Sequence, residues 1–309
     1  MDNIKVLYLR TNLYCNAHCF MCDFWRGTET KEITEEKFEK LLKNLKNIEM
    51  IRFTGGEPLL CEKLPQYISK CHSIGIKTSI ITNGLILDEK LDELLKCGLD
   101  QVVISIDGST EELHDSLRQT KGLWKKIDKT LARITKQYPS LHTRVNTVAS
   151  EKNLFDLANL AKWLDEHNVE QWSIIPIKLE KHKWSDKMTL EDFENGYSIF
   201  QKAIEDCKIQ LLGYSANWAG NIETFWEGKG YIRPKGKCYI TRMVGFYDPF
   251  TDHIYPCNCV PHRKLLFDNN KEEKDWYFEN GHKYCEGCEP LNAYCADFPQ
   301  QIEENIFNF

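Results

Sequence analysis

The sequence predicts an α/β fold, built either as a partial (β/α)6 barrel or as an open parallel sheet. Short runs of apolar and β-branched residues alternate with longer segments that repeat apolar residues at helical spacing. Such alternation indicates parallel strands joined by right-handed crossovers. Six strand–helix units are too few for a closed eight-unit barrel of ~250 residues. In either arrangement, chemistry is expected at the carboxyl ends of the strands.

Six strands are expected, at Val6–Arg10, Met50–Thr54, Thr78–Thr82, Gln101–Ile106, Thr143–Val148 and Gln171–Ile177. Between them, apolar residues recur at i, i+3 and i+4 spacing, most clearly within residues 38–45, 91–95 and 154–164. Thr34 is expected to start a helix as a simple N-cap. Thr189, with Asp192 three residues later, predicts a capping box.

The sequence changes character near residue 210. Beyond about Leu212, Gly, Trp, Tyr and Pro become frequent and long helical periodicity ends. The segment from Cys238 onward is rich in cysteine, as in small domains that a metal centre organises. We therefore predict a partial (β/α)6 TIM-like barrel core at residues 1–210, and a small cysteine-rich domain at residues 211–309.

The composition excludes several classes of function. The chain has 309 residues and a formal net charge of −6, which gives no support for a nucleic-acid partner. No stretch approaches the ~18–20 uninterrupted apolar residues of a membrane span. The N-terminal segment lacks the positive region and apolar core of a signal peptide. We therefore expect a cytoplasmic protein without a nucleic-acid or membrane partner.

Thirteen cysteines require an explanation other than disulfides, which a reducing compartment disfavours. Clustered cysteines in such a compartment more often bind metal or do chemistry. Two groups are visible, one within residues 15–22 and one between residues 238 and 295. The four isolated cysteines are expected to be small buried apolar side chains: Cys61, Cys71, Cys97 and Cys207.

The first group follows the first expected strand and consists of Cys15, Cys19 and Cys22. Three thiolates this close together can hold one compact soft metal centre. In a four-iron, four-sulfur cube they would leave one iron open to an exchangeable ligand. A structural zinc is the alternative, which requires four ligands; His18 could be the fourth, although its place inside the loop makes the reach awkward.

The spacing Cys-x3-Cys-x2-Cys after a first strand resembles the signature of the radical S-adenosylmethionine (radical SAM) superfamily. The resemblance implies that the three cysteines hold a [4Fe-4S] cluster, whose open iron the amino and carboxylate groups of S-adenosylmethionine chelate. It also implies that an electron from the cluster breaks the sulfonium bond, giving a 5′-deoxyadenosyl radical that abstracts hydrogen. Met21 stands where the family often has an aromatic residue, a mild departure that leaves the ligands unchanged.

Later segments resemble the same family in the expected order. Gly55-Gly56-Glu57-Pro58 is similar to the motif that binds the methionine amino group; its glycines would let backbone approach a ligand, and Glu57 would accept from the ammonium group. Arg118 offers a fork for the methionine carboxylate, with a solvated helix residue as the alternative. The other expected S-adenosylmethionine contacts stand at or near strand ends: Asn83, Ser105, Asp107 and Asn146.

The C-terminal cysteines resemble the layout of twitch, an auxiliary-cluster domain of the same superfamily. The resemblance implies an auxiliary [4Fe-4S] cluster with four ligands: Cys238, Cys257, Cys285 and Cys288. Cys259 and Cys295 are reserve ligands. The fuller SPASM form holds two auxiliary clusters and needs more cysteines, and Asp252 stands here in place of its hairpin glycine. A four-cysteine zinc site would look identical in sequence.

A closed auxiliary cluster implies an electron relay and hence net oxidation. We expect dehydrogenation of a small polar metabolite such as a sugar or aminocyclitol, with flavodoxin or ferredoxin as the reducing partner. The alternatives are a ribosomal-peptide maturase that crosslinks or epimerises its substrate, and a non-catalytic structural zinc module. Candidate pocket residues, each with a core or surface role as the alternative, are Trp172, Lys178, Tyr214 and Trp218.

Overall fold

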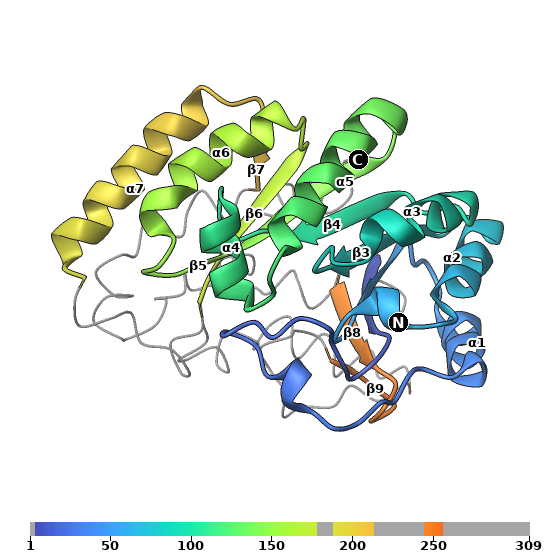
Figure 1. Ribbon diagram of the computed structural model, residues 1–309. Coiled ribbons are helices and arrows are strands. Elements are labelled where there is room, and N and C mark those ends of the chain that lie inside the picture. The colour runs from blue at the N-terminus through green and yellow to red at the C-terminus, as the bar shows by residue number, and fades with distance from the viewer. Residues whose placement is uncertain (1–3, 178–187, 213–243, 256–309) are drawn as a thin grey trace.

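The computed structural model describes residues 4–177, 188–212 and 244–255 (Figure 1). In these residues, nine strands form one sheet in the order β7-β6-β5-β4-β3-β2-β1-β8-β9. All neighbouring strands are parallel except β9, which pairs antiparallel with β8. The strands are β1 (Val6–Arg10), β2 (Met50–Thr54), β3 (Lys77–Thr82), β4 (Gln101–Ser105), β5 (His142–Ala149), β6 (Gln171–Pro176), β7 (Gln210–Leu211), β8 (Val244–Asp248) and β9 (His253–Tyr255).

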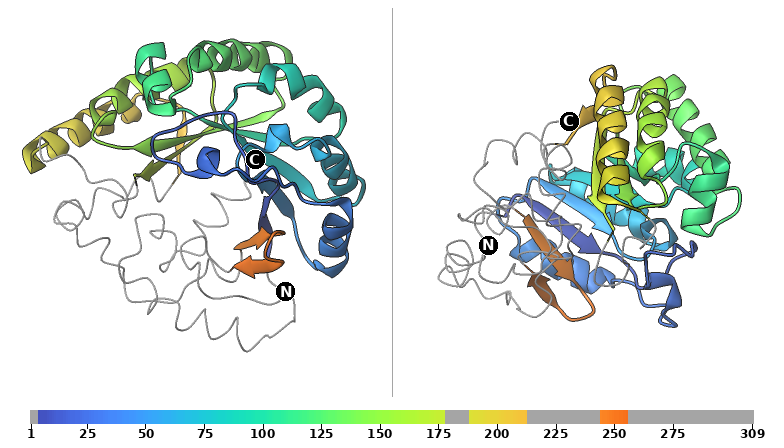
Figure 2. Two further views of the ribbon diagram at one scale, coloured as in Figure 1. Left: turned by 60° about the horizontal axis from the view of Figure 1, so that its bottom comes forward. Right: turned by 90° about the vertical axis from the view of Figure 1, so that its left-hand side faces the viewer.

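The sheet curves, and the helices lie along its outer, convex side (Figure 2). The α-helices are α1 (Glu35–Asn44), α2 (Leu64–Ser73), α3 (Leu87–Lys96), α4 (Glu111–Arg118), α5 (Leu123–Gln137), α6 (Leu157–Glu166) and α7 (Leu190–Glu205). This arrangement confirms the predicted α/β class with a curved parallel sheet. None of the described helices combines the length and the apolar composition that a membrane span requires.

The expected strands coincide with β1 to β6, differing by one residue at most at either end. Both expected helix starts are also confirmed. The Thr34 hydroxyl accepts from the backbone N–H of Lys37 at the start of α1, and Thr189 and Asp192 form a reciprocal capping box at the start of α7. The periodicity of the sequence did not predict β8 and β9, because their short runs lie in a region without regular periodicity; only the resemblance to twitch, in which two cysteines flank a β-hairpin, implied a hairpin between Cys238 and Cys257.

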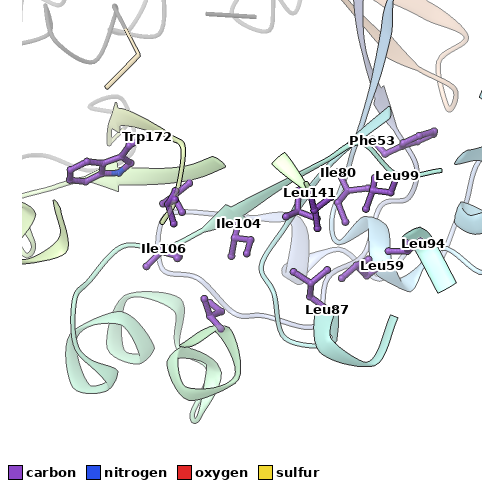
Figure 3. Close-up of a cluster of buried hydrophobic side chains, with 14 of the residues drawn as sticks. Phe53, Leu59, Ile80, Leu87, Leu94, Leu99, Ile104, Ile106, Leu141 and Trp172 are labelled. Atoms are coloured by element: carbon purple, nitrogen blue, oxygen red, sulfur yellow. The ribbon is translucent and has the colours of Figure 1, made fainter. Parts of the chain in front are cut away.

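The hydrophobic core lies between the convex side of the sheet and the helices (Figure 3). Strand alternation sets this arrangement: Leu7 and Leu9 of β1 are fully buried in the core, whereas the intervening Tyr8 is partly exposed on the opposite face. Burial of each such leucine stabilises the fold by about 1.5–3 kcal/mol. Cys61 and Cys71 are buried in this core, as expected for isolated cysteines, and the partly buried Cys97 and Cys207 pack against it.

The inner face of the sheet is polar where the outer face is apolar. Arg52 of β2 is 1% exposed, and its guanidinium donates to the Tyr8 hydroxyl on β1 (2.9 Å) and to Gln101 Oε1 on β4 (3.0 Å). Ser79 on β3 donates to the same Gln101 oxygen at 2.9 Å. Four adjacent strands thus share one hydrogen-bonded layer, which fixes the inner surface below the strand ends.

Strands β8 and β9 form a hairpin that extends the sheet beyond β1. Phe246 of β8 stacks on Tyr8 with ring centroids 4.6 Å apart, and Asp248 lies 2.7 Å from Arg10 Nη1. At the turn, Asp252 has a φ of 55°, a left-handed conformation that aspartate tolerates better than most residues. Although this hairpin falls within the predicted second domain, its strands continue the sheet of the core. The boundary at residue 210 itself stays a prediction.

Trp172, one of the candidate pocket residues, is a core residue. It is fully buried on β6, its indole N–H donates to Thr147 Oγ1 at 2.8 Å, and its ring packs edge-on against Phe200 of α7 at 5.6 Å. The other three candidates lie outside the described residues.

We expect Trp172→Ala to lower the free energy of unfolding by about 3–5 kcal/mol, because it leaves a large cavity under α7. Trp172→Phe fills most of that volume and should cost clearly less. Chemical denaturation followed by far-UV circular dichroism measures both values. Equal stability of Trp172→Ala and the native protein would show that this tryptophan does not hold α7 on the sheet.

Candidate functional site

The loop that carries Cys15, Cys19 and Cys22 begins where β1 ends. The backbone N–H of Thr11 donates to Thr54 O at 2.7 Å, which extends the β1–β2 pairing beyond the last strand residue. Cys19 is buried, whereas Cys15 and Cys22 are partly exposed. The loop therefore places three thiols at the carboxyl edge of the sheet, where α/β folds carry their chemistry.

The Gly55–Gly56 pair is required by this loop. A Cβ on Gly56 would lie 1.9 Å from the carbonyl oxygen of Tyr14, and Gly55 has a φ of 142°, which side chains disfavour. The Gly56 N–H donates to Asn12 Oδ1 at 3.0 Å, and the Glu57 N–H donates to Tyr14 O at 2.9 Å. The sequence predicted that these glycines let the backbone approach a ligand closely; in the structure, the backbone that they approach is that of the cysteine loop.

The Glu57 carboxylate is turned into the fold and is 1% exposed. It accepts from Thr82 Oγ1 (2.6 Å) and the Asn83 N–H (2.8 Å) at the end of β3, and from the Leu59 N–H (3.1 Å). Burial, the largest influence, raises the pKa of this carboxyl to about 7, although the three donors oppose that rise. Pro58 follows as the first residue of a buried 3-10 turn. The carboxylate therefore joins β2 to β3, and its role toward the methionine ammonium stays a prediction.

Asn83 is brought against the cysteine loop, as expected for a residue of the site. Its amide nitrogen donates to Asn16 Oδ1 at 2.8 Å and lies 3.6 Å from Cys15 Sγ. The Ala17 N–H lies 3.5 Å from the same sulfur. The pKa of the Cys15 thiol is raised to about 11, chiefly by burial; Glu57 and Cys19 also raise this pKa, and the N–H donors of Ala17 and Asn83 lower it.

Arg118 connects the fourth strand to the buried cysteine. It ends α4, is 9% exposed, and places Nε 2.6 Å from Asp107 Oδ2 and Nη1 3.7 Å from Cys19 Sγ. Burial lowers its pKa, but the nearby Asp107 carboxylate and Cys19 raise it more, so the pKa stays above its ordinary value. This arrangement excludes the solvated-helix alternative. Two of the guanidinium nitrogens are thus already in contact with protein groups, Nε with Asp107 and Nη1 with Cys19.

Ser105 and Asn146 lie side by side in the β4–β5 pair; Ser105 is the last residue of β4, whereas Asn146 lies three residues before the end of β5. They are register partners in the parallel pair, and both are partly exposed. Asn146 Oδ1 accepts from Arg144 Nε at 3.2 Å. The structure therefore brings Asn83 and Ser105 to the same carboxyl edge of the sheet, with Asn83 in contact with the cysteine loop and Asn146 further back along β5.

Two contributors were missed by sequence reasoning. Asn12 holds Gly56 through its backbone and side-chain oxygens, and its amide donates to Glu57 O at 2.7 Å. Asn153 donates to Asp107 O at 2.8 Å and thereby fixes the turn after β4. An asparagine shortly after the end of a strand is the only sequence signal for either role, and that signal is weak.

His18, the possible fourth zinc ligand, is exposed and packs edge-on against the Trp25 ring at 5.2 Å. The expected auxiliary ligands Cys238, Cys257, Cys285 and Cys288, with Cys259 and Cys295, lie outside the described residues. In the sequence, Cys238 and Cys257 flank the β8–β9 hairpin.

Comparison with known proteins identifies the family. The model of the radical SAM superfamily matches residues 10–164. The chain is 33% identical over 287 residues to an uncharacterised protein of Methanocaldococcus jannaschii, and the match covers 89% of this chain and 92% of that protein. The chain belongs to the radical SAM superfamily.

Two further relatives of this radical SAM protein are informative. It is 34% identical over 139 residues to a GTP 3′,8-cyclase of Chlorobaculum tepidum, and the match covers 43% of this chain but only 42% of that enzyme. The crystal structure of Streptococcus suis SuiB bound to S-adenosylmethionine matches with a TM-score of 0.66 and 16% identity, over 91% of this chain and 68% of that chain. The second likeness shows the fold.

The residues present fit the [4Fe-4S] cluster and S-adenosylmethionine that the family implies. Soft thiols are the ligands that such a cluster takes. N–H donors from Ala17, Asn83 and Arg118 approach the sulfurs of Cys15 and Cys19, and such donors stabilise thiolates. No three His, Cys, Asp or Glu side chains in the described part of the chain surround a single ion. A cube does not need that convergence, because each thiolate binds a different iron.

We expect Gly56→Ala to lose most of its bound iron, because the added Cβ meets Tyr14 backbone that cannot rotate away. The matched control is Gly27→Ala, whose added Cβ would have its nearest neighbour at 3.5 Å, an ordinary contact. Iron per chain, measured after anaerobic reconstitution, compares the two variants. Native iron content in Gly56→Ala would contradict the view that this glycine clamps the cysteine loop.

Proposed function

We propose that this radical SAM enzyme cleaves S-adenosylmethionine reductively and dehydrogenates a small polar metabolite, such as a sugar or an aminocyclitol. The single observation that carries the proposal is the meeting of the three-cysteine loop with polar groups from the segments that follow β2, β3 and β4. Thiols, amides and a guanidinium then lie within one region. Few other chemistries require this combination of soft ligands and polar ligand contacts.

In this proposal, Cys15, Cys19 and Cys22 hold the cluster. The backbone of Gly55-Gly56-Glu57-Pro58 and five polar residues bind and orient S-adenosylmethionine: Asn83, Ser105, Asp107, Arg118 and Asn146. When bound, the cluster supplies the electron that breaks the sulfonium bond of S-adenosylmethionine. Each such electron must come from outside the chain, so a low-potential donor such as flavodoxin or ferredoxin is the proposed partner.

The oxidative outcome depends on the auxiliary cluster, with Cys238, Cys257, Cys285 and Cys288 as its ligands. Two observations support this part of the proposal. The expected hairpin between Cys238 and Cys257 forms as β8 and β9, and its turn residue Asp252 takes the left-handed conformation that a hairpin glycine would supply. A cluster with four cysteine ligands has no open iron, so it accepts an electron rather than binding substrate.

The choice of a small metabolite is supported by one relative. The GTP 3′,8-cyclase of Chlorobaculum tepidum, named for a small polar substrate, is 34% identical over the shared segment. The likeness to SuiB, at 16% identity, concerns the fold and gives no support to a peptide substrate.

We expect Cys19→Ala to form 5′-deoxyadenosine only at background level, because the buried thiolate is a cluster ligand in this proposal. Cys97→Ala is the control, since Cys97 is a partly buried cysteine that only packs against the core. The assay is anaerobic incubation of reconstituted, dithionite-reduced protein with S-adenosylmethionine, followed by chromatography. A native rate of 5′-deoxyadenosine formation in Cys19→Ala would refute the assignment.

The auxiliary cluster is tested separately. We expect Cys285→Ala to lower iron by about four atoms per chain while the cluster at the N-terminal loop remains. Cys259→Ala, in a reserve ligand, should keep its iron. Unchanged iron in Cys285→Ala would remove Cys285 from the ligand set, and zinc in place of iron at either group would support the structural zinc module.

A further inference from the structure

We propose that the buried Asp107–Arg118 pair sets the reduction potential of the cluster at the cysteine loop, through the contact of Arg118 with Cys19. Asp107 and Arg118 are positioning residues in this inference, because both act through the Cys19 sulfur. The inference rests on the proposed function, since it requires a cluster on the three cysteines. It gives the pair a role besides the one expected toward S-adenosylmethionine.

Asp107 is a rigid anchor for the pair. It is fully buried, and its Oδ1 accepts from the Val148 N–H at 2.8 Å. Its own N–H donates to His114 Nδ1 at 3.1 Å, and its carbonyl oxygen accepts from Asn153 at 2.8 Å. Oδ2 is left facing Arg118 Nε at 2.6 Å. Backbone and side chain of Asp107 are thus held at three points besides Arg118, so the carboxylate cannot follow a displaced arginine.

Arg118, the partner of Asp107, is also held in place by its neighbours. It is the last residue of α4, and the Leu117 carbonyl before it accepts from the Phe20 N–H in the cysteine loop at 3.2 Å. The next residue, Gln119, ends the helix with a φ of 46°. The guanidinium side chain is 10% exposed and points Nη1 at Cys19 Sγ, 3.7 Å away. The cysteine loop and α4 are therefore joined both through backbone and through this charge.

The electrostatic consequence follows from burial. Reduction of a cluster adds one negative charge, so a nearby cation favours the reduced form and a nearby anion disfavours it. Because water is largely excluded around the pair, both charges act with little screening. The guanidinium, which lies against the sulfur, raises the potential, and the carboxylate behind it reduces that effect. The two residues therefore have opposite influences on the same cluster.

The test is potentiometric titration of the full-length reconstituted protein, followed by the electron paramagnetic resonance signal that changes when S-adenosylmethionine is added. We expect Arg118→Gln to shift the midpoint potential to a more negative value and Asp107→Asn to shift it to a more positive value. Arg118→Lys keeps the charge and should stay near the native potential. The matched control is the surface pair Arg133 and Asp88, 2.9 Å apart on α5 and α3; Arg133→Gln and Asp88→Asn should leave the potential unchanged.

The outcomes separate this inference from the proposed function. A native protein without a signal that responds to S-adenosylmethionine would overturn the proposed function. Loaded Arg118→Gln and Asp107→Asn with unchanged potentials, or with shifts of the same sign, would overturn only the inference about the pair. If Arg118→Gln fails to take up iron, the comparison of Asp107→Asn with Arg118→Lys decides the matter, because only the first should shift positively.

Discussion

The contact between the cysteine loop and the start of the Gly55–Gly56 turn is the constraint on which the site depends. At this contact two segments of backbone cross with no room for a single Cβ, and N–H groups of the turn donate to oxygens of Asn12 and Tyr14. A loop of more than twenty residues between β1 and α1 would otherwise sample many conformations at an entropic cost. The crossing fixes the base of that loop, so the three thiols are placed by the sheet rather than by their own sequence.

Hydrogen bonds connect this contact to the end of the neighbouring strand β3. Glu57 leaves the turn and accepts from Thr82 and the Asn83 backbone, and Asn83 reaches back to Asn16 and Cys15. A closed path of hydrogen bonds thus runs from the loop to β2, to β3 and back to the loop. The Glu57 carboxylate is subject to opposing influences, because burial raises its pKa while each donor lowers it. A buried carboxyl with three donors specifies one geometry more than it adds stability.

The sequence predicted the parts of this site that have local signals. The six strands follow from short apolar runs, and the cysteine loop and the glycine pair follow from spacing. What could not be predicted is which partner each polar group would choose. Arg118 carries the same sequence signal whether it faces solvent, a ligand or Asp107, and only the packing of α4 against the loop decides between them. Likewise, Trp172 looks equally suited to a pocket or a core until α7 is placed over it.

Strand β8 explains why the cysteine loop has a firm base. Without it, β1 would be the edge of the sheet, hydrogen-bonded on one side only, and edge strands fray and twist more readily. Pairing of Val6–Leu9 with Val244–Tyr247 gives β1 a neighbour on both sides, and the stacked Tyr8–Phe246 rings and the Arg10–Asp248 pair reinforce it up to the last strand residue. The residues that complete this support come from a part of the chain more than 230 positions away. Pairing with β8 therefore supports the strand from which the cysteine loop starts, while the crossing at Gly56 fixes the loop itself, so residues from both ends of the described chain contribute to the position of the three thiols.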